Sequence, residues 1–176
     1  MDSNALQHAV VAEYDPAWPQ TFQVLGARLR PVLAPHWVLE HVGSTAVPGL
    51  AAKPIIDIDV VVAAPGEVPA AVKALLQLGY AHAGQQGVDG REVFRQPEKW
   101  PAHHLYVVVA GSPAHRDHVD LRDHLRRSLG AVAQYVAEKR RLAPLLVADR
   151  AGYQHGKAGV IHELLRHARS QGFESA

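Results

Sequence analysis

Residues 40–62 read EHVGSTAVPGLAAKPIIDIDVVV, and this stretch decides the fold more than any other part of the chain. It contains a Gly43-Ser44 turn, twelve further residues, and then Asp57-Ile58-Asp59 inside an apolar run. Side chains two apart on a strand point to the same side, so the carboxylates share one face and the apolar residues between them share the other. Paired carboxylates on such a face can hold a divalent cation, and a turn of small residues upstream can cradle phosphates.

The composition is that of an ordinary globular protein of 176 residues, with 48% apolar and 20% charged residues. A chain of this length can bury a substantial core. The net charge of +1 argues against broad nucleic-acid binding. The absence of cysteine excludes disulfides, cysteine zinc sites and a cysteine nucleophile, and it favours a cytoplasmic location. No signal peptide is recognisable and no apolar run reaches the ~20 residues that cross a bilayer, so no membrane partner is expected.

Hydrophobic periodicity and turn residues predict an α+β fold with a mixed sheet. We expect strands over residues 8–14, 37–42, 54–63, 91–95 and 103–110, and helices over 16–32 and 68–78. Asp15 is expected to cap the first helix and Gly79 to close the second. After Pro113 the pattern is helical, with apolar stripes such as Leu121, Leu125 and Leu129. We expect one domain over residues 1–176, with a sheet half over about 8–110 and a helical half over about 114–170 around one cleft.

The spacing of these motifs resembles a known signature. The pattern apolar-Gly-Ser, twelve residues, Asp-apolar-Asp-apolar is similar to that of the polymerase-β-like nucleotidyltransferase superfamily. The longer string HVGSTAVPGLAAKPIIDIDV resembles the diagnostic segment of the GrpB family, a branch of that superfamily. Further similarity covers roughly residues 10–168, including YDPAWP at 14–19, HHL at 103–105 and LRDHLR at 121–126. The resemblance implies a nucleotidyltransferase-like mixed β-sheet with helices on one face and a C-terminal helical half.

Asp57 and Asp59 are the candidate ligands of Mg²⁺ or Mn²⁺, hard cations that prefer oxygen. Metal ions held there would stabilise the entering and leaving oxygens of a displacement at the α-phosphate. The alternative is a solvated strand face that carries two carboxylates. Gly43 and Ser44 are candidate contacts to the β- and γ-phosphates, although an ordinary strand-to-helix turn uses the same residues. Lys53 could neutralise phosphate charge or simply lie on the surface.

The superfamily resemblance implies a third carboxylate on a later strand, which completes the metal site and can act as general base. The matching strand, from His103 to Val107, carries no acid. The GrpB resemblance implies His-His-Leu-His there, and this chain has Tyr106 at the last position. Three alternatives follow: His104 serves as base or ligand, Glu92 on the neighbouring strand substitutes, or the catalytic set is incomplete.

Lys139 and Lys157 fall on inward apolar stripes of the C-terminal helices. A lysine in such a position needs a partner or a wet cleft. A triphosphate would supply the partner, and the alternative is a side chain that snorkels at the rim of the core. Four arginines could bind an acceptor or lie on solvated faces: Arg91, Arg95, Arg122 and Arg126.

These features predict a Mg²⁺-dependent nucleotidyltransferase that moves a nucleoside monophosphate from an NTP to an acceptor. One alternative is a catalytically weak nucleotide-binding or regulatory module that kept the fold and lost the base. Another is a metal-dependent phosphohydrolase that uses the same carboxylates with water. The expected partners are therefore an NTP and an acceptor of unknown identity, and the sequence defines neither the base nor the oligomeric state.

Overall fold

A five-stranded mixed sheet is the centre of the computed structural model, which describes residues 11–170. The strands lie in the order β1-β2-β5-β4-β3. Only β2 and β5 run parallel, and the other three neighbouring pairs are antiparallel. The strand bounds are Val38–Val42 for β1, Ile56–Val62 for β2, Ala81–His82 for β3, Arg91–Arg95 for β4 and His103–Val109 for β5. The mixed α+β fold expected from the sequence is thus confirmed.

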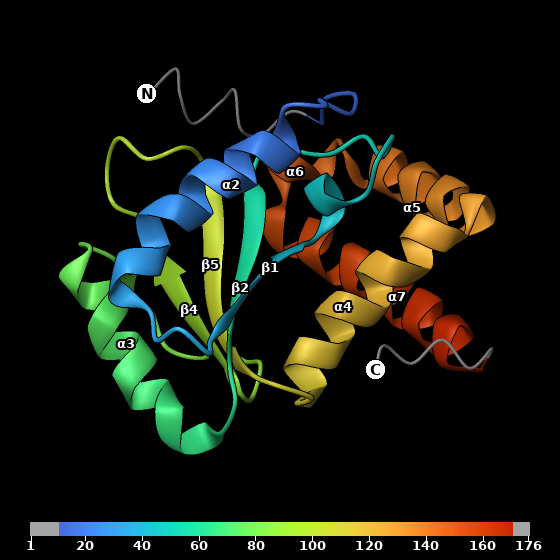
Figure 1. Ribbon diagram of the computed structural model, residues 1–176. Helices are drawn as coiled ribbons and strands as arrows, with labels where there is room; N and C mark the ends of the chain where they lie inside the picture. The colour runs from blue at the N-terminus through green and yellow to red at the C-terminus, as the bar shows by residue number, and fades with distance from the viewer. Residues whose placement is uncertain (1–10, 171–176) are drawn as a thin grey trace.

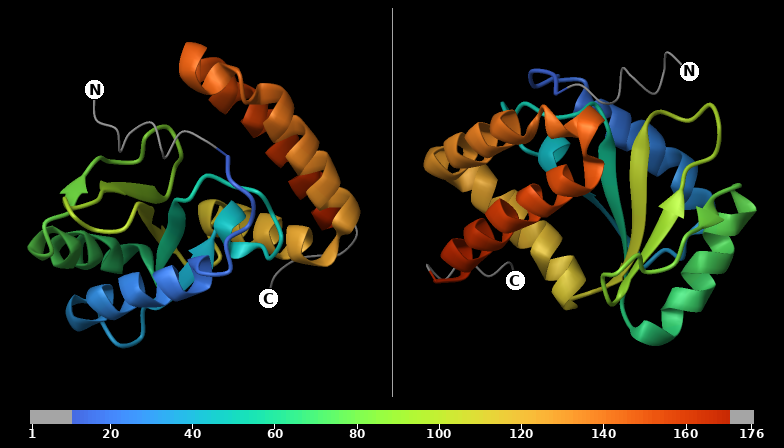
Figure 2. Two further views of the ribbon diagram at one scale, coloured as in Figure 1. Left: turned by 90° about the horizontal axis from the view of Figure 1, so that it is seen from above. Right: turned by 180° about the vertical axis from the view of Figure 1, so that it is seen from behind.

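Two helices cover one face of this sheet, α2 at Trp18–Leu29 and α3 at Val68–Gln77. They lie in front of the strands in Figure 1 and below them in the left view of Figure 2. The main core lies between these helices and the sheet, and it includes the fully buried Leu25, Ile58 and Leu75. Burial of this apolar surface is the main driving force for folding of the sheet half.

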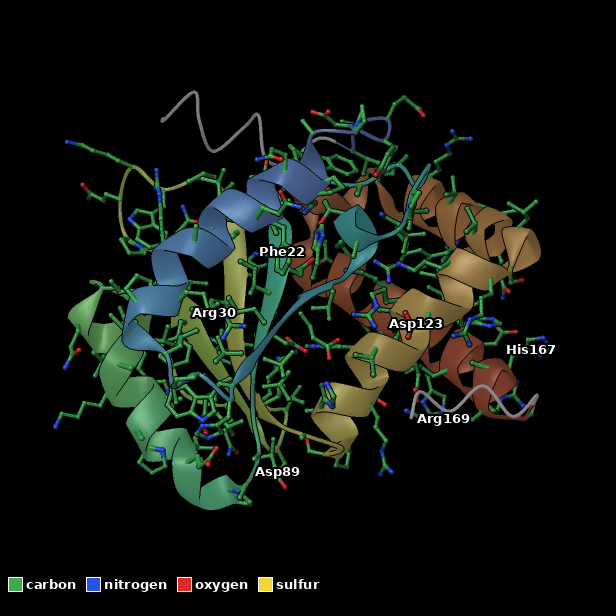
Figure 3. The ribbon with its side chains drawn as sticks, viewed as in Figure 1. Phe22, Arg30, Asp89, Asp123, His167 and Arg169 are labelled. Atoms are coloured by element: carbon green, nitrogen blue, oxygen red, sulfur yellow. The ribbon has the colours of Figure 1, made fainter. Side chains whose placement is uncertain are left out.

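Short 3₁₀ turns and polar contacts connect α2 and α3 to the strands. The turns are η1 at Arg30–Val32, η2 at Ser44–Ala46 and η3 at Pro65–Glu67. Phe22, which reaches from α2 toward the sheet in Figure 3, stacks on the ring of His41 with 4.9 Å between centroids. Arg30 Nη1 donates a 2.7 Å hydrogen bond to the backbone carbonyl of Trp37. These contacts bring α2 against β1 and the turn that follows it.

The register of the parallel pair decides what the second face carries. Asp57 lies beside His104, and Asp59 beside Tyr106. The alternate residues of both strands, such as Ile58 beside Leu105, belong to the main core. Because side chains alternate along a strand, the two carboxylates, His104 and Tyr106 share the face turned away from α2 and α3.

The helical half is built from four helices: α4 at Pro113–Arg127, α5 at Leu129–Leu142, α6 at Leu145–Ala148 and α7 at Arg150–Ser170. They lie to one side of the sheet, as both views of Figure 2 show. Val47 and Leu50, which follow the Gly43 turn, pack into a second core with Tyr135 and Leu164. The segment between β1 and β2 therefore attaches the helices to the sheet. No helix in the described part of the chain is long and apolar enough to cross a membrane.

The first two predicted elements differ from the structure. The strand expected at 8–14 is reduced to one bridge, between Ala12 and Ala52, and residues 8–10 lie outside the described residues. The first helix starts at Trp18 with Ala17 at its N-cap position, not at Pro16. Asp15 Oδ1 accepts a hydrogen bond from the backbone N–H of Ala17 at 2.8 Å, which forms a turn before the helix instead of a cap.

Leu129 is also wrongly assigned by periodicity. It is 89% exposed, while Leu125 is buried. Ser128 adopts an extended backbone between α4 and α5, and its Oγ accepts from the N–H of Ala131 at the start of the new helix. The break rotates Leu129 out of the stripe, because the face of a helix is defined only while its backbone is continuous.

Candidate functional site

Asp57 lies at the point where β2, β5 and the Gly43 turn meet. Its Oδ1 accepts a 2.9 Å hydrogen bond from Nδ1 of His104, and its side chain is 26% exposed. The backbone of Gly43 packs directly against the carboxyl group: a Cβ at Gly43 would lie 2.8 Å from Asp57 Cγ. Gly43 also has φ +71° and ψ −169°, a conformation essentially restricted to glycine. Both the backbone conformation of the turn and the close approach of the Asp57 carboxylate therefore require glycine at position 43.

Electrostatics keeps Asp57 ionised. Burial alone would raise the pKa of its carboxyl group, but the hydrogen bond and charge of His104, followed by the charges of Lys157 and His118, outweigh it. The pKa of Asp57 consequently lies below its ordinary value. An ionised, partly exposed carboxylate is what a hard cation requires.

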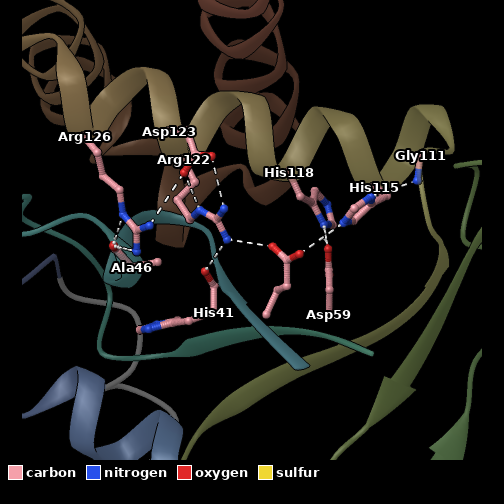
Figure 4. Close-up of polar contacts among 10 residues, drawn as sticks. His41, Ala46, Asp59, Gly111, His115, His118, Arg122, Asp123 and Arg126 are labelled. Atoms are coloured by element: carbon pink, nitrogen blue, oxygen red, sulfur yellow. Dashed lines mark hydrogen bonds and ion pairs between the residues drawn. The ribbon is translucent and has the colours of Figure 1, made fainter. Parts of the chain in front are cut away.

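Asp59 is in a different environment. Its side chain is fully buried, and both oxygens accept from Nδ1 of His118 on α4, at 3.0 and 2.9 Å (Figure 4). Burial raises the pKa of Asp59 above its ordinary value, and the neighbouring Asp57 adds to this effect. Burial opposes protonation of His118, but its hydrogen bond to Asp59 and the charge of that carboxylate raise the pKa of the histidine. Asp59 and His118 therefore form a buried charge-assisted pair.

Lys139 reaches the Gly43–Ser44 turn from α5. It is 5% exposed, and its Nζ donates to the backbone carbonyl of Ala51 at 2.9 Å and to Ser44 Oγ at 3.3 Å. The ammonium group also lies 5.1 Å from the ring centroid of Tyr135. Burial, with the charge of Lys157 nearby, lowers the pKa of Lys139 to about 7. Within residues 11–170, this lysine is buried against a backbone carbonyl and a hydroxyl and forms no ion pair, an arrangement that suits the binding of an anion.

Two further lysines lie close to Lys139. The hydroxyl of Tyr135, and beyond it the carboxylate of Asp57, raise the pKa of Lys157 against the opposing effect of burial. Lys53 places its Nζ 5.1 Å from the ring centroid of Tyr153 on α7. The charges of Lys157 and Lys53 both act on Lys139. The structure thus brings the three predicted lysines to one neighbourhood, in which Lys139 contacts Ser44.

Within the described strand β5, no residue supplies the third carboxylate. Glu40 of β1, in register with Asp59, lies on the same face, but it pairs with Arg122 of α4. Tyr106 occupies the predicted position, with its ring between the guanidinium of Arg91 at 5.1 Å and the ring of His118 at 5.4 Å. Glu92 pairs in register with Val107, so it projects from the opposite face, where it interacts with His82 at 2.6 Å. The suggestion that Glu92 replaces the missing acid is therefore wrong.

Two of the four candidate arginines have structural roles. Arg122 Nη1 lies 2.8 Å from Glu40 Oε2 and also donates to the carbonyl of His41, while its Nε pairs with Asp123. Arg126 donates from Nε and Nη2 to the carbonyl of Ala46 at 3.0 and 2.8 Å. Figure 4 shows both side chains pointing from α4 to β1 and η2. They attach the helical half to the sheet, so they are neither free for an acceptor nor simply solvated.

A metal ion would find two carboxylates here and no complete ligand set. Among the described residues, no group of three or more His, Cys, Asp and Glu side chains is arranged to hold an ion. Mg²⁺ is commonly bound by one or two carboxylates together with substrate phosphates and water. Asp57 fits that role as it stands, whereas Asp59 fits it only after His118 releases its oxygens. The residues present suit an ion that arrives with phosphates better than one bound alone.

Sequence reasoning missed His118, which makes the closest contacts to Asp59. No motif marks it, because the contact joins residues 59 positions apart through the packing of α4. Tyr135 lies on the same helix as Lys139. Its spacing of four residues from Lys139, one helical turn, was the available signal that the phenol and the ammonium lie together.

Comparisons with known proteins agree with this fold. The model of the GrpB protein family matches residues 8–167. Among curated relatives, UPF0157 protein SCO7215 of Streptomyces coelicolor is 34% identical over 86% of this chain and 79% of its own length. UPF0157 protein YqkA of Bacillus subtilis is 32% identical over 74% of this chain, but the match spans only 38% of YqkA.

The solved structure of a GrpB protein gives the same result. The crystal structure of the conserved protein GrpB from Enterococcus faecalis superposes with a TM-score of 0.80 and 29% identity, and covers 94% of this chain and all of that one. A chain of the Cid1 poly(U) polymerase, bound to MgGTP, superposes with a TM-score of 0.46 and 12% identity, over 78% of this chain and 47% of its own. From the family model, the curated relatives and the Enterococcus structure, the chain belongs to the GrpB family.

Proposed function

We propose that this protein transfers a nucleoside monophosphate from an NTP to a hydroxyl group of an acceptor. One observation carries the proposal: the ionised carboxylate of Asp57 packs against the Gly43–Ser44 turn, beside three lysines from three different segments. Lys139 is the buried member of this cluster, and burial of a charge is costly unless it is paired. A triphosphate would bring negative charge to it. A cytoplasmic location, which the lack of cysteine favours, is part of this proposal.

The lysines and the turn have the binding role in this scheme. Lys139, Lys157 and Lys53 would neutralise the β- and γ-phosphates, and Ser44 Oγ would donate a hydrogen bond to one of their oxygens. Lys139 and Lys157 lie under the helices α5 and α7, so they also exclude water from that side of the triphosphate. Cations held in a site of low polarity stabilise charge that develops on the leaving pyrophosphate.

His104 has the geometry of a general base. Its Nδ1–H donates to Asp57, so the neutral ring carries its lone pair on Nε2. The side chain is 52% exposed, which allows an acceptor to approach that nitrogen. His104 would take the proton of the acceptor hydroxyl as its oxygen attacks the α-phosphorus and pyrophosphate leaves. Asp57 keeps the ring in the required tautomer and orientation.

Asp57 and Asp59 are the residues that would hold Mg²⁺ or Mn²⁺ when the NTP brings it. The ion would neutralise phosphate charge and stabilise the entering and leaving oxygens of an in-line displacement. Before then, the hydrogen bond of His118 satisfies the buried carboxylate of Asp59.

The test is pyrophosphate release from each NTP with Mg²⁺ or Mn²⁺, with and without a pool of hydroxyl acceptors. Release that depends on the acceptor supports transfer. His104→Ala should lower transfer by roughly 10²–10⁴-fold while the affinity for the NTP changes little. His155→Ala, on an exposed position of α7, is the matched control. NTP turnover that survives both Asp57→Asn and His104→Ala would contradict the mechanism.

A nucleotide-binding module without turnover is the second candidate. It is favoured by a specific observation: both carboxylates are engaged by histidines, and Tyr106 replaces the third acid. It predicts NTP binding measurable by calorimetry with no pyrophosphate or phosphate released. Release of phosphate without an acceptor would instead identify a phosphohydrolase. The same two assays therefore separate all three activities.

A further inference from the structure

The candidate arginines divide into two pairs that differ in their contacts. Arg122 and Arg126 are bound to β1 and to the turn η2, as described above. Arg91 and Arg95 lie four residues apart on β4, an even spacing, so they share one face of that strand. Arg91 lies in register with Val108 and Val93 with Tyr106, which places this face on the side of Asp59 and His104. Within residues 11–170, neither Arg91 nor Arg95 forms an ion pair.

Arg91 is partly buried in this position and incompletely bonded. Its guanidinium stacks on Tyr106 with 5.1 Å to the ring centroid, and its buried Nε has no hydrogen-bond partner. Such an unsatisfied buried donor is costly and therefore uncommon in folded proteins. Stacking fixes the plane of the guanidinium but leaves its N–H groups available. A planar fork held in this way matches the geometry of a carboxylate or a phosphate.

Seen from behind, β4 and β5 have no helix in front of them (right view of Figure 2). His104, the proposed base, is on β5, between the carboxylates of β2 and the arginines of β4. The three lysines lie on the other side of Asp57, with η2, α5 and α7. Cations therefore flank the site on two opposite sides, and the proposed triphosphate uses only one of them.

We propose that Arg91, assisted by Arg95, binds an anionic group of the acceptor, so that the substrate is a small hydroxyl compound carrying a carboxylate or a phosphate. This inference rests on the proposed function and specifies its acceptor. The hydroxyl would lie near His104 Nε2, with the anionic group one or two strands away on the guanidinium fork. The acceptor is expected to be small because the chain has a net charge of only +1. Two arginines are too few to bind along a long polyanion.

The experiment uses three related probes: glycerol, glycerate and glycerol 3-phosphate. Their binding is measured by calorimetry in the presence of inorganic triphosphate and Mg²⁺, which occupy the lysine site without specifying a base. Glycerate or glycerol 3-phosphate should bind, and uncharged glycerol should not. Comparison of the two anions separates a carboxylate from a phosphate acceptor. Arg91→Gln should weaken binding of the preferred anion by about 10- to 100-fold, the effect of losing a charge-assisted pair.

Two controls separate this inference from the proposed function. Arg166→Gln removes one positive charge from an exposed position of α7 and should leave probe binding unchanged. Arg91→Gln should change the affinity for inorganic triphosphate less than about twofold, whereas Lys157→Met should weaken it about tenfold. If triphosphate binds through Lys157 but Arg91→Gln leaves glycerate and glycerol 3-phosphate unaffected, the acceptor inference is wrong and the nucleotide site stands.

Two other outcomes also overturn the inference. In one, neither anion binds more tightly than glycerol. In the other, the nucleotidyl group is transferred to the 3′-hydroxyl of a short RNA, with a dependence on Arg91, while both small anions fail to bind. Arg91→Lys adds a test of geometry: it keeps the charge but loses the planar fork, so it should recover only part of the lost affinity.

Discussion

The two faces of the β2–β5 pair differ more than any other two regions of this protein. On one face, Ile56, Ile58 and Val60 are buried beneath α2 and α3, and each is at most 1% exposed. On the other face, at the positions between these residues, Asp57 and Asp59 meet histidines from β5 and α4. The same backbone thus supports an apolar core on one side and a cluster of ionisable groups on the other.

This difference shows where stability comes from and where it is lost. Burial of apolar side chains favours the folded state, whereas burial of Asp59 and Lys139 opposes it and shifts both pKa values toward the neutral forms. Natural proteins keep such unfavourable groups mainly where they are needed for function. The following predictions test the contrast, in order of their expected effect on the free energy of unfolding.

Substitutions on the apolar face should lower the free energy of unfolding the most. Ile58→Ala removes a fully buried side chain and leaves a cavity, so it should lower the free energy of unfolding by about 2–5 kcal/mol. Ile58→Val, the matched control, should cost only about 0.5–1.5 kcal/mol. Urea unfolding measures both. If Ile58→Ala lowered the free energy of unfolding less than Asp57→Asn, the apolar face would not be the main source of stability.

The free energy of unfolding should rise with pH because of Lys139. Its pKa is about 7 in the folded state and 10.5 in the unfolded chain, so between these values only the unfolded state holds the proton. The free energy of unfolding therefore increases from about pH 7 to about pH 10, by an amount on the order of 3 kcal/mol. Unfolding curves at a series of pH values measure this slope.

The variant Lys139→Met should lose that rise, and Lys73→Met, at an exposed position of α3, should keep it. Triphosphate binding reports on the same group: the anion should restore the charge of Lys139, so binding near pH 8 should take up a proton. Calorimetry in buffers of different ionisation enthalpy counts that proton. A pH profile of Lys139→Met identical to that of the wild type would show that Lys139 is not perturbed.

Gly43→Ala should cost about 1–3 kcal/mol, because the backbone conformation at this position is essentially restricted to glycine. It should also displace the Asp57 carboxylate from His104, because the new Cβ would overlap it. Gly49→Ala is the matched control: φ is +76°, but no atom lies within 4 Å of the added Cβ. The difference between the two variants, measured by urea unfolding and by triphosphate affinity, isolates the contact with Asp57. Equal triphosphate affinities would exclude that contact from the binding site.

Asp57→Asn should have the smallest effect on stability, below about 1 kcal/mol, because the amide oxygen can still accept from His104 and the side chain is partly exposed. Its effect on binding should be large. The affinity for inorganic triphosphate with Mg²⁺ should fall by about tenfold or more, and the gain that Mg²⁺ gives over triphosphate alone should disappear. Glu98→Gln, an exposed change after β4, serves as control. A Mg²⁺-dependent gain that persists in Asp57→Asn would remove this carboxylate from the metal site.

Alternation along residues 56–62 is visible in the sequence, and it correctly assigns Asp57 and Ile58 to opposite faces of an inner strand. The Gly43–Ser44 turn is equally local, since its special conformation needs glycine. Glu92 shows the limit of such reasoning. Its face depends on the register between β4 and β5, and a shift of one residue moves a side chain to the other face.

The sequence by itself determined the strands β1, β2, β4 and β5, the opposite chemical character of the two faces of β2, and the resemblance to the GrpB family, because periodicity and motif spacing are local properties of the chain. Only the tertiary structure decided that Asp59 is buried under His118, that Lys139 reaches Ser44, and which arginines remain available for a ligand. These contacts join residues from 15 to 95 positions apart. They depend on how helices dock on the sheet, and docking is set by the summed packing of both cores and not by any pattern within one segment.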